Sequence, residues 1–202
     1  MMKFLFNSFN QLLDSSLGLR IQPSSDARLR AARSEILSIK RCELVVDVGA
    51  NDGKWALRLR KDGFIGHIDS FEPTAVYSIL EREASEDKNW RVHNVALSNF
   101  SGTAHINVAS NDFLSSSLLA PSGILDANKG ILFTKRESVN VSTLDSHFTG
   151  LTEENAYLKL DVQGSELSVL KGGETFLRNC SAIEFESALV PQYVGESSHH
   201  DI

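Results

Sequence analysis

The sequence VVDVGANDG at residues 45–53 decides the fold of this chain. Its apolar half, together with Glu43 and Leu44, is typical of a strand buried in a parallel sheet. Gly49 and Gly53 allow the chain to turn close to a ligand, and a helix is expected over residues 52–61. A strand, a glycine-containing turn and a helix N-terminus with free amide groups form a ligand-binding unit of α/β proteins.

The same alternation of strand and helix continues on both sides of this unit. We expect further strands at 66–71, 90–97, 157–161 and 182–186, and further helices at 27–40, 73–86 and 165–178. Short strands at 103–108 and 138–142 flank a loop rich in Ser, Gly and Asn at 110–129, which is a candidate substrate lid. The pattern predicts a doubly wound α/β three-layer sandwich with a mainly parallel sheet.

The composition fits one globular domain with a small-molecule ligand. The 202 residues carry 20 Lys and Arg against 26 Asp and Glu, a formal charge of −6, and the basic residues are dispersed, which argues against nucleic-acid binding. Cys42 and Cys180 have no disulfide or zinc-ligand spacing, so we expect a reduced, cytoplasmic protein.

The two ends of the chain are expected to lie outside the main domain. Residues 1–20 predict an amphipathic helix that packs on the body or a partner, with no export signal and no run long enough to span a membrane. We therefore assign 1–40 as a helical lead-in, 41–196 as the ligand-binding domain, and 197–202, with His199 and His200, as a tail.

The polar residues after the first strand favour a ligand that carries a positive charge. A dinucleotide fingerprint would need a glycine where Asn51 stands, and Gly53-Lys54 lacks the following hydroxyl of a phosphate loop. The carboxylate of Asp47 at the strand tip favours a cationic ligand. S-adenosylmethionine, with its ammonium and sulfonium groups, fits this requirement.

The next two strand ends would complete such a site. Glu72 lies 25 residues after Asp47, where α/β folds place an acid that binds ribose hydroxyls, although the same residue could instead cap the helix that starts at Pro73. Ala96 and Leu97 would border the adenine. His93 is interpreted as a partly buried strand histidine.

The later strands place further charged residues at the same edge. Alternation puts Lys159 and Asp161 on one face, with Asp161 near the reacting group. Lys159 is either catalytic or a structural partner of Asp161 or Glu184. Glu166 is interpreted as a first-turn residue that interacts with the helix dipole. Asp161, Glu184 and Glu186 form an acidic cluster, but no histidine joins it, so we assign no metal.

The chain resembles the FkbM-type family of S-adenosylmethionine-dependent methyltransferases. The motifs that carry this resemblance span about 150 residues in order: VVDVGANDG (45–53), SFEP (70–73), HNVALSN (93–99), SSSLL (115–119), VNVSTLDS (139–146), YLKLDVQGSELSVLKGG (157–173) and IEFESALVPQYVGE (183–196). The resemblance implies the class I methyltransferase fold and methyl transfer to a hydroxyl of a sugar, polyketide or related metabolite. The family tolerates Gln163.

The resemblance also implies roles for single residues. Asp47, Gly49 and Asn51 would hold the methionine portion of the cofactor within a turn that includes Ala50 and Gly53. Glu72 would hold the ribose, Ala96 and Leu97 would border the adenine, and Asp161 would face the reaction centre, with Lys159 beside it.

Relatives usually continue beyond the segment that ends near Glu196 with a helix and two more strands. We therefore expect a truncated sheet with reduced stability, doubtful activity, and possible homodimerisation through the exposed edge strand. One alternative is a non-catalytic cofactor-binding or scaffold protein. Another is a nicotinamide-dependent oxidoreductase, which Asn51 and the lack of a Tyr-x-x-x-Lys relay disfavour.

Overall fold

A computed structural model describes residues 25–123, 130–149, 155–198 and 200–202. The chain divides into two compact units, one ending at Glu35 and the other comprising Ile36–Ile202. Helix α2 covers Ser25–Ile39, close to the predicted 27–40. The helix predicted for residues 1–20 and the assignment of His199 to a tail lie outside the described residues. No helix in the described part of the chain is long and apolar enough to cross a bilayer.

The centre of the second unit is a five-stranded, fully parallel sheet with the order β3-β2-β1-β7-β8. Its strands are β1 (Leu44–Val48), β2 (His67–Phe71), β3 (Trp90–His93), β7 (Ala156–Leu160) and β8 (Cys180–Phe185). Every residue of β1 and β7 is buried, which explains why the sequences of both strands are mainly apolar. β8 is an edge strand, as predicted, whereas dimerisation through it stays a prediction.

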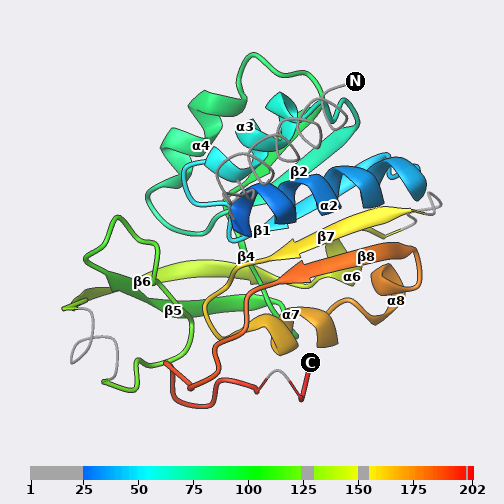
Figure 1. The fold of residues 1–202 in the computed structure, drawn as a ribbon. Helices are drawn as coiled ribbons and strands as arrows, with labels where there is room; N and C mark the ends of the chain where they lie inside the picture. Colours follow the sequence, from blue (N-terminus) through cyan, green and yellow to red (C-terminus); the bar gives the residue numbers. More distant parts are fainter. Residues whose placement is uncertain (1–24, 124–129, 150–154, 199) are drawn as a thin grey trace, which may run out of the picture. The chain divides into compact units, whose positions relative to one another are not determined.

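Helices cover both faces of this sheet and make three layers (Figure 1). One face carries α3 (Lys54–Lys61) and α4 (Tyr77–Ala84), and the other carries α6 (Leu144–His147), α7 (Glu166–Lys171) and α8 (Glu174–Leu177). The predicted doubly wound α/β architecture with a mainly parallel sheet is therefore confirmed.

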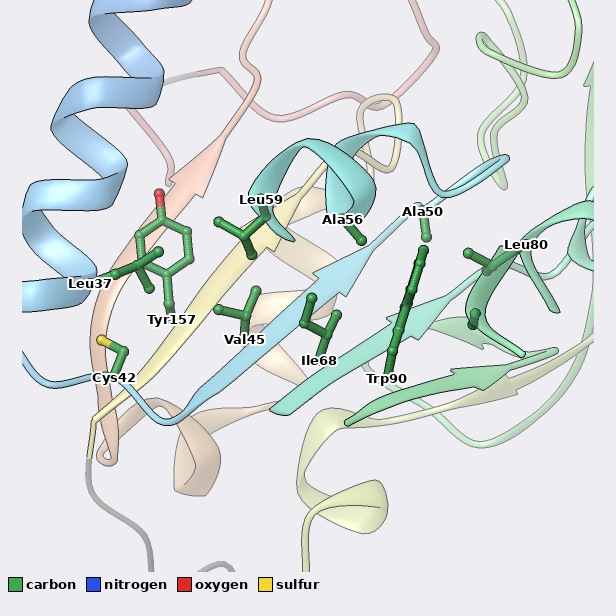
Figure 2. Close-up of a cluster of buried hydrophobic side chains, with 11 residues drawn as sticks. Leu37, Cys42, Val45, Ala50, Ala56, Leu59, Ile68, Leu80, Trp90 and Tyr157 are labelled. Carbon is green, nitrogen blue, oxygen red and sulfur yellow. The ribbon is translucent and has the colours of Figure 1, made fainter. Parts of the chain in front are cut away.

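The two faces of the strands supply two separate hydrophobic cores. Val45, Ile68 and Trp90 point toward α3 and α4, where they pack with Leu59 and Leu80 (Figure 2). The alternate residues of β1, β2 and β7 pack against α6, α7 and α8. Because successive strand residues point to opposite faces, these three strands contribute to both cores.

The prediction of one strand over residues 90–97 was wrong. β3 ends at His93, and the chain leaves the parallel sheet because the side chain of Asn94 donates to the carbonyl of Glu72 at 3.0 Å. Ala96 and Leu97 form β4, which pairs with the end of β6 in a second sheet. That sheet has the order β4-β6-β5, and its long antiparallel pair comprises β5 (Gly102–Ala109) and β6 (Phe133–Ser142).

Two helix predictions also need correction. The helix predicted for 165–178 is interrupted at Gly172-Gly173, because glycine is a poor helix former, and it forms α7 and α8. The short helix α6 was not predicted. α4 begins at Tyr77 rather than at Pro73, because the intervening residues form a turn around the side chain of Glu72.

Candidate active site

The turn after β1 is fixed at the carboxyl edge of the sheet by hydrogen bonds to the end of β2. The backbone amides of Gly49 and Ala50 both donate to the carbonyl of Phe71 at 3.0 Å, which ties the turn to the end of β2. Gly49, Asn51 and Gly53 all have positive φ angles, of 78°, 48° and 81°. The turn therefore departs sharply from strand geometry before α3 begins.

Two of these positions need glycine for different reasons. A Cβ atom on Gly49 would lie 1.9 Å from the carbonyl oxygen of Asp161, so the tips of β1 and β7 can approach only if residue 49 has no side chain. A Cβ atom on Gly53 would lie 3.0 Å from the side chains of Leu80 and Trp90. Gly53 thus serves the packing of the turn on the core.

We expect Gly49→Ala to destabilise the protein more than Gly63→Ala does. Gly63 also has a positive φ, of 98°, but nothing lies within 4 Å of its Cβ position, so it is a control for backbone strain alone. The clash at residue 49 should add about 1–3 kcal/mol to the loss of unfolding free energy. Urea denaturation measures both variants, and equal losses would contradict the close approach.

Glu72 is a buried acid at the end of β2, with 5% of its surface exposed. Its Oε2 accepts from the amide of Asn51 at 3.0 Å, and its Oε1 accepts from the amide of Thr74 at 2.8 Å and from the Thr74 hydroxyl. Burial raises the pKa of Glu72, and these hydrogen bonds oppose the rise only in part. The carboxyl group is therefore fixed in orientation, and its Oε2 still has one lone pair for a ligand.

A cavity opens between these strand ends and the segment that follows β5. It contains about 640 Å³ of space not filled by atoms, part of which is open to solvent. Its wall consists of Val48, Gly49, Asn51, Phe71, Glu72, Pro73, Thr74, Val95, Ala96, Leu97, Ile106, Phe113, Leu114, Ser116, Ser117, Leu118, Asp161, Val162, Gln163 and Ser165.

The cavity brings together six of the ten predicted site residues. They come from the ends of β1, β2, β4 and β7: Gly49, Asn51, Glu72, Ala96, Leu97 and Asp161. The other four are not part of its wall. Ala50 lies in the core beneath the turn, Gly53 faces Leu80 and Trp90, and Asp47 and Lys159 lie deeper in the sheet.

Asp47 and Lys159 form a buried ion pair on adjacent strands. The Lys159 Nζ lies 2.9 Å from Asp47 Oδ1, and both residues are at most 6% exposed. The same ammonium donates to the carbonyl of Gly49 at 3.1 Å and lies 3.7 Å from Asp161 Oδ2. Burial opposes the charge, but Asp47 and Asp161 outweigh it and raise the pKa of Lys159. Lys159 therefore stays protonated and fixes the turn through its hydrogen bond to Gly49.

Asp161 reaches the cavity from the tip of β7, with 33% of its side chain exposed. Its Oδ1 accepts from the Gln163 side chain at 2.7 Å. Of the other acids predicted nearby, Glu184 accepts from the hydroxyl of Tyr157, and Glu166 accepts from the amides of Val162 and Gly164. Glu166 therefore holds the turn before α7, which is a structural role, like the first-turn role that we predicted for it.

Comparisons with known proteins show the family of this chain. Residues 47–202 match the Methyltransferase FkbM domain, so the match covers every strand of the central sheet except the start of β1. The chain belongs to the FkbM methyltransferase family. The predicted family is thus confirmed.

The other two comparisons add little to this methyltransferase assignment. No curated protein matches the chain in sequence. A proposed caffeoyl-CoA O-methyltransferase from Staphylococcus aureus has a similar solved structure, with 5% sequence identity, a TM-score of 0.39 and 87% of this chain covered. The chain spans 61% of the length of that protein.

Several wall residues of the cavity were not predicted. Part of the proposed lid, residues 113–118, forms one wall, and it is held there because Ser117 Oγ donates to the carbonyl of Gln163 and Tyr193 Oη donates to the carbonyl of Ser115. Ser165 Oγ is buried and has no hydrogen-bond partner among the described residues. A buried hydroxyl in a cavity wall is a binding group for a polar ligand.

Proposed function

We propose that this methyltransferase uses S-adenosylmethionine to methylate a hydroxyl oxygen of a small-molecule or glycan acceptor such as a sugar or polyketide. The observation that carries the proposal is the buried carboxyl group of Glu72 in the cavity wall, directly beside the turn after β1. An acid at this strand end can accept a hydrogen bond from a ribose hydroxyl.

The residues of the wall fit the other parts of the cofactor. Gly49 and Asn51 would contact the methionine portion, and the apolar side chains of Ala96 and Leu97 would border the adenine. The unpaired hydroxyl of Ser165 offers an additional polar contact. Asp47, in contrast, would act through the turn it supports, because its carboxylate is paired with Lys159.

The cofactor supplies an electrophilic methyl group, so the protein chiefly aligns the acceptor and excludes water. Asp161 is the proposed group that orients or deprotonates the acceptor hydroxyl, because its carboxylate is the acid at the tip of β7 that reaches the cavity. Phe113, Leu114, Ser116, Ser117 and Leu118 also line the cavity and would help to exclude water from the reaction.

We expect Glu72→Ala to weaken S-adenosylmethionine binding by at least about tenfold. A hydrogen bond to a charged group contributes about 1.5–3 kcal/mol, and each 1.4 kcal/mol corresponds to a factor of ten in affinity. Calorimetric titration with the cofactor and with S-adenosylhomocysteine measures this loss. Glu86→Ala removes an exposed acid after α4 and should leave the affinity unchanged.

The same titration separates the alternatives. If the folded chain binds neither compound, the non-catalytic scaffold replaces the proposed enzyme. Binding of a nicotinamide dinucleotide in preference to S-adenosylmethionine would instead favour the oxidoreductase. Equal affinity of the wild-type protein and Glu72→Ala would remove Glu72 from the site.

A further inference from the structure

A second group of potential ligands lies on the face of the sheet that α6 covers. Asp69 of β2, His93 of β3 and His147 of α6 each offer one ligand atom, and these atoms all lie within 4.8 Å of one another. The three residues are separated by 24 and 54 positions in the sequence, so only the fold brings them together. None of them lines the cavity of the proposed active site.

The geometry points to a divalent transition-metal site formed by Asp69, His93 and His147, with Zn²⁺ as the best-fitting ion. Two imidazoles and one carboxylate are a common ligand set for zinc, and three protein ligands leave a fourth position for water. Ligand atoms on a tetrahedral zinc are about 3.4 Å apart, given zinc–ligand bonds of about 2.0–2.1 Å. The distances between ligand atoms in this cluster run from 2.7 Å to at most 4.8 Å, which includes this spacing. Small side-chain movements therefore suffice to bind the ion.

The surroundings hold the three side chains in place. The His93 ring stacks on Phe71 at 4.6 Å between centroids, and the His147 ring meets His93 edge-on at 4.4 Å. α6 is fixed because Asp145 accepts from the amides of Thr175 and Phe176. Ligands that are positioned before the ion arrives lose little freedom on binding, which favours affinity.

The charges around the cluster also suit a cation. Asp69 is 1% exposed, so its carboxylate is a buried negative charge, and Arg91 binds its Oδ2 at 2.7 Å while His93 Nε2 lies 2.7 Å from its Oδ1. A ligating carboxylate usually has such an outer partner. The Arg91 side chain is 66% exposed, so solvent screens its repulsion of the ion.

Binding requires one rearrangement of a proton. The hydrogen that His93 Nε2 donates to Asp69 Oδ1 must leave Nε2, by a change of tautomer that places the ring's hydrogen on Nδ1, before both atoms can bind the ion. The ion would then join the ends of β2 and β3 to α6. Because Phe71 stacks on His93 and also lines the methyltransferase cavity, the ion would stiffen one wall of that cavity.

Titration of the full, untagged chain with Zn²⁺ tests this site, with Co²⁺ as a spectroscopic probe. We expect one equivalent to bind, visible Co²⁺ absorption bands, and a higher melting temperature. His147→Gln should reduce the affinity by at least about 100-fold, because even outer partners of metal ligands contribute about 10–100-fold. Asp69→Asn, which keeps the shape of the side chain, should have a similar effect.

His67→Gln is the matched control, because His67 is exposed at the start of the same strand as Asp69. It should bind Zn²⁺ as the wild-type protein does. No binding by the wild-type protein, or equal binding by His147→Gln and wild type, would overturn the proposal. This result is independent of S-adenosylmethionine binding, which is measured without added metal.

Discussion

Lys159→Met is expected to lower the free energy of unfolding by about 3–5 kcal/mol, the usual cost of breaking a buried ion pair by removing one partner. Asp47 is fully buried, and Lys159 is its charged partner at 2.9 Å. Without the ammonium, an uncompensated carboxylate remains between β2 and β7, and the carbonyl of Gly49 loses a donor. Urea denaturation at neutral pH measures the loss.

Two controls show whether the loss comes from the pair itself. Lys54→Met removes the exposed partner of Asp52 and should have a much smaller effect, because solvent already screens that pair. The double variant Asp47→Asn/Lys159→Met should recover much of the stability, since no charge is left buried alone. If the double variant is as unstable as the sum of the two single variants, the ion pair does not explain the loss.

Asp161→Asn is expected to reduce turnover by about 10²–10⁴-fold, the usual contribution of a positioned general base. The asparagine keeps the shape of the side chain and removes its charge, and Lys159 keeps its partner Asp47. Release of S-adenosylhomocysteine in the presence of a panel of sugar and polyketide alcohols measures turnover.

Cofactor affinity distinguishes catalysis from binding in this variant. S-adenosylmethionine affinity should change by less than about 1 kcal/mol, because Asp161 is assigned to the acceptor rather than to the cofactor. Gln163→Ala is a companion variant, since Gln163 donates to Asp161 at 2.7 Å and orients it. An Asp161→Asn enzyme with wild-type turnover would remove Asp161 from the proposed mechanism.

Much of the sheet could be predicted because its strands carry unambiguous signals. β1 and β7 are buried on both faces, so their sequences are apolar apart from Asp47 and Lys159, and the adjacent turns contain Gly49 and Gly164. The strand predicted over 90–97 failed because no glycine or proline separates β3 from β4. The side-chain hydrogen bond of Asn94 that separates them depends on Glu72, which is distant in the sequence.

The positions of the strand ends predicted which residues gather at the cavity, whereas the roles of these residues stay predictions. Residues at the carboxyl ends of parallel strands meet at one edge, which brought Asn51, Glu72 and Asp161 together correctly. The rest depends on contacts that the sequence does not encode locally. Strand order places both Asp47 and Glu184 beside Lys159, but Lys159 pairs with Asp47, and Glu184 accepts from Tyr157. The group formed by Asp69, His93 and His147 follows from the placement of α6.

A crystal structure of the protein with S-adenosylhomocysteine tests the central claim most directly. The account predicts a ribose hydroxyl on Oε2 of Glu72, the homocysteine portion along Gly49 and Asn51, and the adenine beside Ala96 and Leu97. A ligand bound in the separate hollow lined by Glu166, Glu186 and Glu196 would contradict the account. So would a ribose that makes no contact with Glu72.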